Sequence, residues 1–331
     1  MKRLMTTLAL ALALSSAIAQ IVTDKDLASP GYGEKKLKKA PKKVFINQFV
    51  VNYQVLSSSS EASSKSKTQM TVGLTGIEAQ DLQDITDNAY EMIVDKLENA
   101  GFEIVSADEA GQTEFYNDWT RVEGGTPSQA QLMGYISTSP NDFDFYVKKI
   151  NKDGKNKGTF FDTTPKLSKQ LGDIPVLEAN VNFQYVTISG TTYINDATKL
   201  KGVVNYEIPP SAIAQSAEGI FGSKIETNPT SVRVVWKGGA AGAGALAMIA
   251  LTPKKGIAIP GVLEEKKFKE YASPNVNYNN SFAPIVIQDR KEITVSHQVK
   301  ADREAYIKKT QQALNEYLSI VVDSFIANAN G

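Results

Sequence analysis

The sequence predicts an α+β fold, in which a mixed, largely antiparallel sheet is packed by two or three helices, with a loop-rich insertion and a long C-terminal helix. Three observations lead to this class. Residues 176–186 alternate between apolar and polar side chains, which is typical of an antiparallel strand with one buried and one wet face. Residues 84–100 and 302–327 instead repeat apolar side chains at helical spacing.

The first predicted strand covers residues 44–55, and its length favours an antiparallel neighbour. Side chains of one parity give it an apolar face, formed by Phe45, Phe49, Val51, Tyr53 and Val55. The serine-rich run at 57–67 predicts a mobile loop, because it offers little apolar surface to bury. Shorter strands are predicted at 102–105, 200–208, 231–236, 284–287 and 293–299.

The two predicted helices have clear apolar stripes. In the first, Gly101 follows the last turn, where a left-handed cap is favoured. Its stripe comprises Ile85, Ala89, Met92, Ile93 and Leu97. In the C-terminal helix the stripe comprises Ile307, Leu314, Leu318, Val321 and Phe325. A further helix is expected at 107–121.

Residues 112–164 are expected to form a loop-rich insertion, because periodicity is lost there and glycine and proline recur. The aromatic side chains of this segment are expected to anchor the insertion to the core, which is the commoner use of aromatic side chains in loops. The alternative is that four of them form a candidate interaction surface: Tyr135, Phe143, Phe145 and Tyr146.

The first 19 residues have the layout of a cleavable export signal. Lys2 and Arg3 precede an apolar run at 8–14, and Ala17-Ile18-Ala19 forms a small-x-small cleavage site. The run is too short to cross a bilayer, which takes about 20 residues. We therefore expect a signal peptide at 1–19, a solvated polar leader at 20–43, and a single domain at 44–331.

Composition excludes several classes of function. The chain has no cysteine, which removes disulfides, thiol catalysis, cysteine-based metal sites and a lipidated cysteine anchor. It has 36 basic and 36 acidic residues, and removing Lys2 and Arg3 leaves 34 against 36, a net charge of −2. Bulk charge therefore gives no attraction for nucleic acid.

Few residues suggest catalysis. His297 is the one histidine, it lies on the more apolar face of a predicted strand, and no Gly-x-Ser-x-Gly elbow accompanies it, so a structural role is expected. Asp142 and Asp144 are interpreted as solvated loop acids, with a carboxylate hydrolase using acids of 142–162 as the alternative. We expect no catalytic residue, metal site or cofactor.

The segment that begins at Gly238 is rich in glycine and alanine but lacks the Gly-Lys-Ser/Thr ending of a phosphate-binding loop. The favoured interpretation is a flexible connection followed by a buried strand at 245–251. The alternative is a hairpin over 243–259 that packs in an oligomer or enters a membrane. Its apolar residues are Leu246, Met248, Ile249, Leu251, Ile257 and Ile259.

The order of elements resembles the periplasmic domain shared by curli secretion channel lipoproteins and the amino-terminal domain of the TolB type. The similarity rests on KKVFINQFVV at 42–51, VDKLENAGFEIVSADEA at 94–110, LSKQLGDIPVLEANVNFQYV at 167–186, and the last helix. This chain departs from the pattern in having no lipidated cysteine and in carrying the serine-rich run and the aromatic insertion. The resemblance implies a non-catalytic assembly or interaction module of the bacterial envelope.

These observations favour an exported envelope binding or assembly module that acts through protein surfaces. Its expected partners are other envelope proteins or further copies of the chain, and membrane contact is allowed but not required. Its expected location is periplasmic, outer-membrane-associated or secreted. The competing hypotheses are a membrane-associated, secretion-channel-like oligomer with hairpins around 231–260, and the carboxylate hydrolase.

Overall fold

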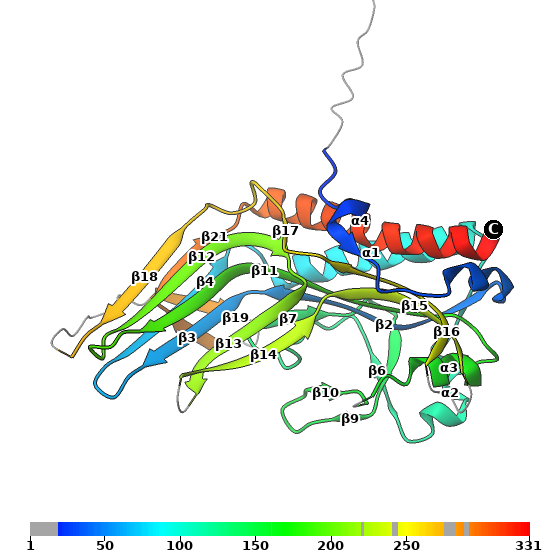
Figure 1. The fold of residues 1–331 in the computed structure, drawn as a ribbon, viewed down its shortest axis with the longest axis horizontal. Coiled ribbons are helices and arrows are strands. Elements are labelled where there is room, and N and C mark those ends of the chain that lie inside the picture. The colour runs from blue at the N-terminus through cyan, green and yellow to red at the C-terminus, as the bar shows by residue number, and fades with distance from the viewer. Residues whose placement is uncertain (1–18, 160, 220–221, 240–243, 275–282, 288–290) are drawn as a thin grey trace, which may run out of the picture.

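The computed structural model describes residues 19–159, 161–219, 222–239, 244–274, 283–287 and 291–331, so the predicted export signal lies outside the described residues up to residue 18. The fold is α+β, as predicted, with mixed but largely antiparallel sheets and a long C-terminal helix (Figure 1). The main sheet makes up one layer of the molecule, and helices α1 and α4 lie along one side of it (Figure 1).

Two long strands form the centre of the main sheet. β2 (Lys43–Gln54) pairs in parallel with β11 (Val176–Thr192), from Phe45↔Val176 to Tyr53↔Phe183. β2 has the expected antiparallel neighbour in β7, but its longest pairing, with β11, is parallel, because the chain returns to β2 only after α1 and the insertion. The remaining strands of this part are β1 (Leu27–Ala28), β5 (Glu103–Val105), β7 (Tyr135–Thr138), β15 (Ser231–Gly238) and β16 (Ala245–Pro253).

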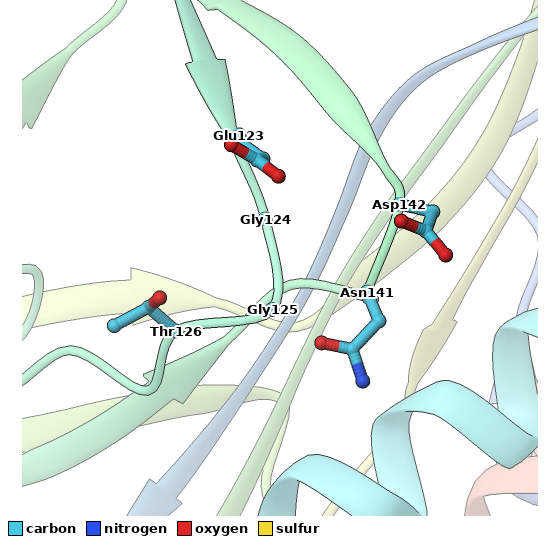
Figure 2. Close-up of a pocket in the computed structure, with 6 residues that line it drawn as sticks. All are labelled: Glu123, Gly124, Gly125, Thr126, Asn141 and Asp142. Atoms are coloured by element: carbon cyan, nitrogen blue, oxygen red, sulfur yellow. The ribbon is translucent and has the colours of Figure 1, made fainter.

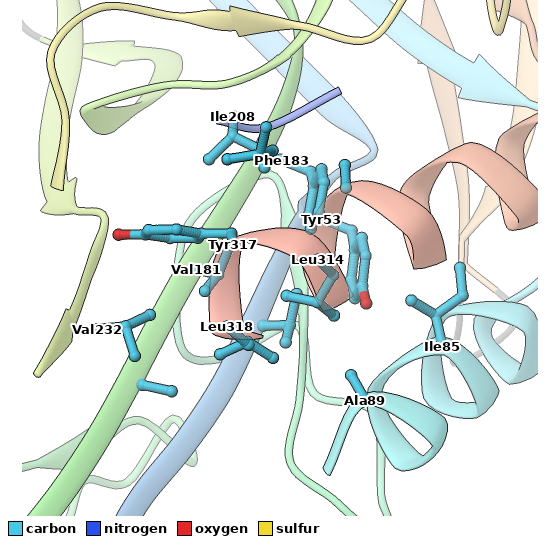
Figure 3. Packing of buried hydrophobic residues seen from close by; sticks show 14 of the residues in the cluster. Tyr53, Ile85, Ala89, Val181, Phe183, Ile208, Val232, Leu314, Tyr317 and Leu318 are labelled. Atoms are coloured by element: carbon cyan, nitrogen blue, oxygen red, sulfur yellow. The ribbon is translucent and has the colours of Figure 1, made fainter. Parts of the chain in front are cut away.

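Helices α1 (Ala79–Asn99) and α4 (Arg303–Asn330) cover the core. Gly101 takes the predicted left-handed conformation, with φ of +83°. The Asp302 carboxylate caps α4 by accepting a hydrogen bond from the Ala305 backbone at 3.1 Å. Figure 3 shows both helices packed against the sheet through Ile85, Ala89, Val181, Phe183, Leu314 and Leu318. Burial of these apolar faces holds the two layers together.

Beyond the main sheet, β11 continues into an elongated two-sheet arm. One sheet contains the end of β11 with β12 (Thr198–Ile208), β17 (Ile257–Ala258) and β18 (Lys267–Ala272). The other contains β3 (Leu56–Ala62), β4 (Lys67–Thr75) and β21 (His297–Lys300). Two further ribbons are β13 (Ser211–Gly219) with β14 (Gly222–Pro229), and β19 (Ala283–Ile287) with β20 (Lys291–Val295). Figure 1 shows the strands of the arm running away from the helices.

The serine-rich run is not a mobile loop, which corrects the sequence prediction. Residues 57–62 form β3, and the hydroxyls that replace apolar side chains find hydrogen-bond partners on neighbouring strands. Ser58 bonds Thr71 at 2.9 Å, and Ser59 bonds Ser223 at 2.7 Å. Burial of a hydroxyl costs little when it is paired in this way, so a serine-rich segment can form a strand inside a sheet assembly.

The polar face of β11 is covered rather than wet as alternation predicted: Asn182 and Gln184 are buried, and Glu178 and Asn180 are half-buried. Ribbon β13–β14 covers it, and Asn182 donates hydrogen bonds to the Asn228 carbonyl at 3.0 Å and to Thr230 at 2.9 Å. Asn52 on β2 in turn donates to Asn182 at 3.0 Å. These side chains satisfy one another, which allows an asparagine row inside the protein.

The predicted polar leader is folded onto the protein, so the expectation of a solvated segment is wrong. It forms η1 (Asp24–Asp26), β1 and η2 (Glu34–Lys39), which lie against β16 and α4. Val22 and Leu37 are fully buried. The backbone N–H groups of Ile21 and Val22 donate to one Glu316 carboxylate oxygen of α4, at 2.7 and 2.8 Å. A few apolar side chains therefore anchor a mostly charged segment.

The insertion is built from short elements. The helix expected at 107–121 is only α2 (Ala107–Gly111), because β6 begins at Thr120 and pairs with β8. β7 is not a loop but a strand of the main sheet, antiparallel to β2. The other elements are η3 (Glu114–Tyr116), β6 (Thr120–Glu123), β8 (Asp144–Val147), β9 (Lys149–Ile150), β10 (Asn156–Lys157) and α3 (Thr164–Gln170).

Replacing Leu37 by alanine tests whether the N-terminal segment contributes to stability. Because this side chain is fully buried between α4 and β16, we expect the free energy of unfolding to fall by about 2–4 kcal/mol. The matched change Lys36→Ala, at an exposed position of the same short helix, should alter it by less than about 0.5 kcal/mol. Urea unfolding of the two variants measures the difference, and equal stabilities would contradict a docked segment.

Candidate functional site

A shallow groove made of two adjoining hollows, of about 530 and 510 Å³, lies in the insertion, between β6 and the loop that leads into β8. Figure 2 shows Glu123 and Asp142 on its two sides, with Thr126 and Asn141 below them. Gly125 has φ of +79°, and an added Cβ would lie 2.2 Å from the Asn141 side-chain oxygen. Close approach of two backbone segments therefore shapes the groove.

The acids that line the groove are either paired with arginine or exposed. Asp144 pairs with the Arg121 guanidinium, which also binds Asp108. Glu123 and Asp142 are exposed. General acid catalysis by a carboxylic acid depends on a dry environment that raises its pKa, and an open groove does not supply one. Within the described ranges, moreover, no group of acids and histidine has a metal-binding arrangement.

Asp162, the last acid of the suggested hydrolase, lies in a different interaction. Arg233 binds it with both guanidinium nitrogens, at 2.8 and 3.1 Å, and also binds Glu178. Partial burial acts to raise the pKa of the Asp162 carboxyl, but the hydrogen bonds and charge of Arg233 outweigh it and hold this pKa below its ordinary value. The arrangement ties α3 to the sheet and offers no free carboxylate.

The four aromatic residues of the candidate interaction surface pack within the chain, so the structure agrees with core anchoring and the alternative of a presented surface is wrong. Tyr135 and Phe143 are buried, and the Tyr135 hydroxyl donates to Gln184 at 3.3 Å. Phe145 is half-buried with its ring 6.0 Å from that of Phe143. Tyr146 is half-buried and stacks on Tyr116 at 4.2 Å between ring centres. These rings anchor the insertion.

The hairpin suggested over 243–259 is not formed by the described residues. β16 pairs with β15 and β1, whereas β17 pairs with β12, so the two strands belong to different parts of the structure. β16 pairs with the free edge of β15 and is the next strand of the main sheet. The six apolar residues divide into buried Ile249, Ile257 and Ile259, half-buried Met248 and Leu251, and exposed Leu246.

His297 connects the two sheets of the arm. Its Nε2 lies 2.8 Å from a Glu270 carboxylate oxygen of β18, and its ring stacks on Phe268 at 4.3 Å. The contacts agree with the structural role expected from the sequence, because both partners belong to the opposite sheet.

The arm exposes large apolar side chains that the sequence interpretation did not single out. Ile194 is fully exposed, and Tyr193 beside it is 43% exposed, in the turn between β11 and β12. Ile225 on β14 is 58% exposed. The sequence could have indicated Tyr193 and Ile194, because they are two apolar residues inside a turn, where polar residues are usual. Apolar side chains held out in solvent mark candidate contact surfaces when they gather on one part of a protein.

No protein-family model, curated protein or solved structure matches this chain. Among the helices in the described part of the chain, none has the combined length and apolar character that crossing a bilayer requires. Function is therefore inferred from the surfaces of this structure.

The Asp162–Arg233 pair gives a prediction for stability against pH. A carboxyl whose folded pKa lies below its unfolded value stabilises the fold above the unfolded pKa, and this contribution is lost as pH falls through the folded pKa. Asp162→Asn should therefore lower the free energy of unfolding by about 0.5–1 kcal/mol at neutral pH, a value reduced for solvent screening. The deficit should close on acidification below about pH 4.

Unfolding of both proteins in urea between pH 3 and 7 measures this difference. The background Arg233→Gln serves as the control, because Asp162 then lacks its cationic partner and keeps only the Thr164 N–H, so the asparagine substitution should have a much smaller effect at every pH. A deficit that persists in this background, or that widens in acid, would contradict the pairing.

Proposed function

We propose that this chain is an exported, non-catalytic binding or assembly module of the bacterial envelope, and that it acts through the arm. The observation that carries the proposal is the exposure of Tyr193 and Ile194 in the turn between β11 and β12, and of Ile225 on β14. Burial of such side chains against a partner removes apolar surface from water and supplies binding energy. The partner is a protein of the envelope, a second copy of the chain included.

Two further considerations support this proposal. Of the acids named for the hydrolase, Asp142 is exposed in an open groove and Asp144 and Asp162 are engaged by arginine, so a hydrolase has less support than a binding role. The order of sequence elements resembles envelope domains that work as assembly or interaction modules. An arm of paired strands also fits such a role, because its side chains are presented on a surface that needs little ordering upon binding.

Photo-cross-linking in cells tests the proposal. A benzoylphenylalanine residue at position 194 or 225 should give adducts of higher mass, because these positions would be covered by a partner. The matched control is position 308 on α4, where Lys308 is exposed on the helical side of the protein. We expect adducts at the two arm positions and none at 308.

Adducts at 308 with none on the arm would overturn the proposed surface. Activity on a panel of glycans and peptides that disappears in Asp142→Asn or Asp144→Asn would overturn the non-catalytic assignment.

A further inference from the structure

The outer face of the sheet β11–β12–β18 carries an unusual set of side chains. Its three strands are in register, and each cross-strand row contains one residue from each strand. The three rows are Thr187–Val203–Lys267, Ser189–Lys201–Lys269 and Thr191–Lys199–Tyr271. The side chains from β11 all end in a hydroxyl, and four of the other six positions are lysine. Seven of these nine residues are exposed, whereas Lys199 and Val203 are half-buried.

The lysines of this face are not neutralised within the described part of the chain. Lys201 lies directly opposite Lys269, and no ion pair is formed by either residue or by Lys199 and Lys267. Glu270 on β18 points to the other side of the sheet, where it binds His297. Like charges placed opposite each other destabilise a strand pair. The face therefore carries a stability cost that an anionic ligand would remove.

We propose that this lysine face binds a linear acidic polysaccharide. Neighbouring strands lie about 5 Å apart and alternate residues of a strand about 7 Å apart, so the four ammonium groups form a flat cationic grid. A chain of sugars with repeated carboxylates can contact several of them together. The hydroxyls of Thr187, Ser189 and Thr191 can hydrogen-bond to sugar hydroxyls, and the half-exposed Tyr271 ring can stack on a sugar face.

The composition of the face favours a polysaccharide over other anionic partners. A bilayer-contacting surface places large apolar side chains beside its lysines, whereas three of the nine residues here are small hydroxyl side chains. A protein interface has an apolar centre, and the centre of this face is the Lys201–Lys269 pair. The inference goes beyond the assembly role proposed above and uses different residues, so either can fail without the other.

Binding to polygalacturonate tests the inference, measured by affinity electrophoresis at low salt with neutral dextran as the reference polymer. In the arm variant, Lys199, Lys201, Lys267 and Lys269 are replaced by glutamine. In the matched control, the exposed lysines of η2 are replaced in the same way, at Lys35, Lys36, Lys38 and Lys39. Both variants lose four positive charges. We expect the arm variant to bind at least about tenfold more weakly, because fewer counterions are released, and the control to stay within about twofold.

The folded state is checked in the same proteins. Because the arm variant removes the Lys201–Lys269 repulsion, its Tm should equal or exceed that of the wild type. Three results would overturn the inference: no retardation of the wild type by polygalacturonate, equal loss of binding in both variants, or lysine-dependent binding to phosphatidylglycerol vesicles in preference to polygalacturonate. The last result would assign the face to a membrane surface.

Discussion

Parallel pairing of β2 with β11 is the interaction on which the other parts of the structure depend. It joins segments more than 120 residues apart, and the other strands of the main sheet attach to one of these two directly or through intervening strands. Across the pair, the rings of Tyr53 and Phe183 stack at 5.4 Å between centres. Helices α1 and α4 pack on this side, so one core unites residues from Val22 to Ala329.

The two halves of β11 pair with different strands. The same strand therefore belongs to both the main sheet and the arm. Its first half lies between β2 and β15, and its second half pairs with β12. The change occurs at an irregularity between Gln184 and Val186, where the Gln54 side chain accepts hydrogen bonds from the backbone of Tyr185 and Val186, both at 3.0 Å. A buried polar side chain thus satisfies the backbone where the sheets diverge.

The buried core and the proposed contact surfaces use different residues. One core extends from the helices and the main sheet to the facing sheets of the arm, whereas Tyr193, Ile194, Ile225 and most of the lysine face are exposed. Substitutions at these exposed positions therefore need not disturb the core. A surface of this kind suits a protein that holds other molecules, because its side chains are fixed by paired strands before a partner arrives.

The sequence alone determined the fold class, the principal strands and the two long helices. These elements can be predicted because a helix or strand with one buried face repeats its apolar residues at a fixed spacing along the chain. It also indicated that the aromatic insertion could be anchored in the core and that His297 has a structural role. Only tertiary structure decided that the serine run is a strand, that Asn182 is buried, and that the N-terminal segment is docked through Leu37. In each case a partner distant in the chain satisfies a polar group or covers an apolar one. The lysine face also could not be predicted from the sequence. Lys201 and Lys269 become neighbours only through strand pairing, and the spacing of residues along the chain does not determine which strands pair.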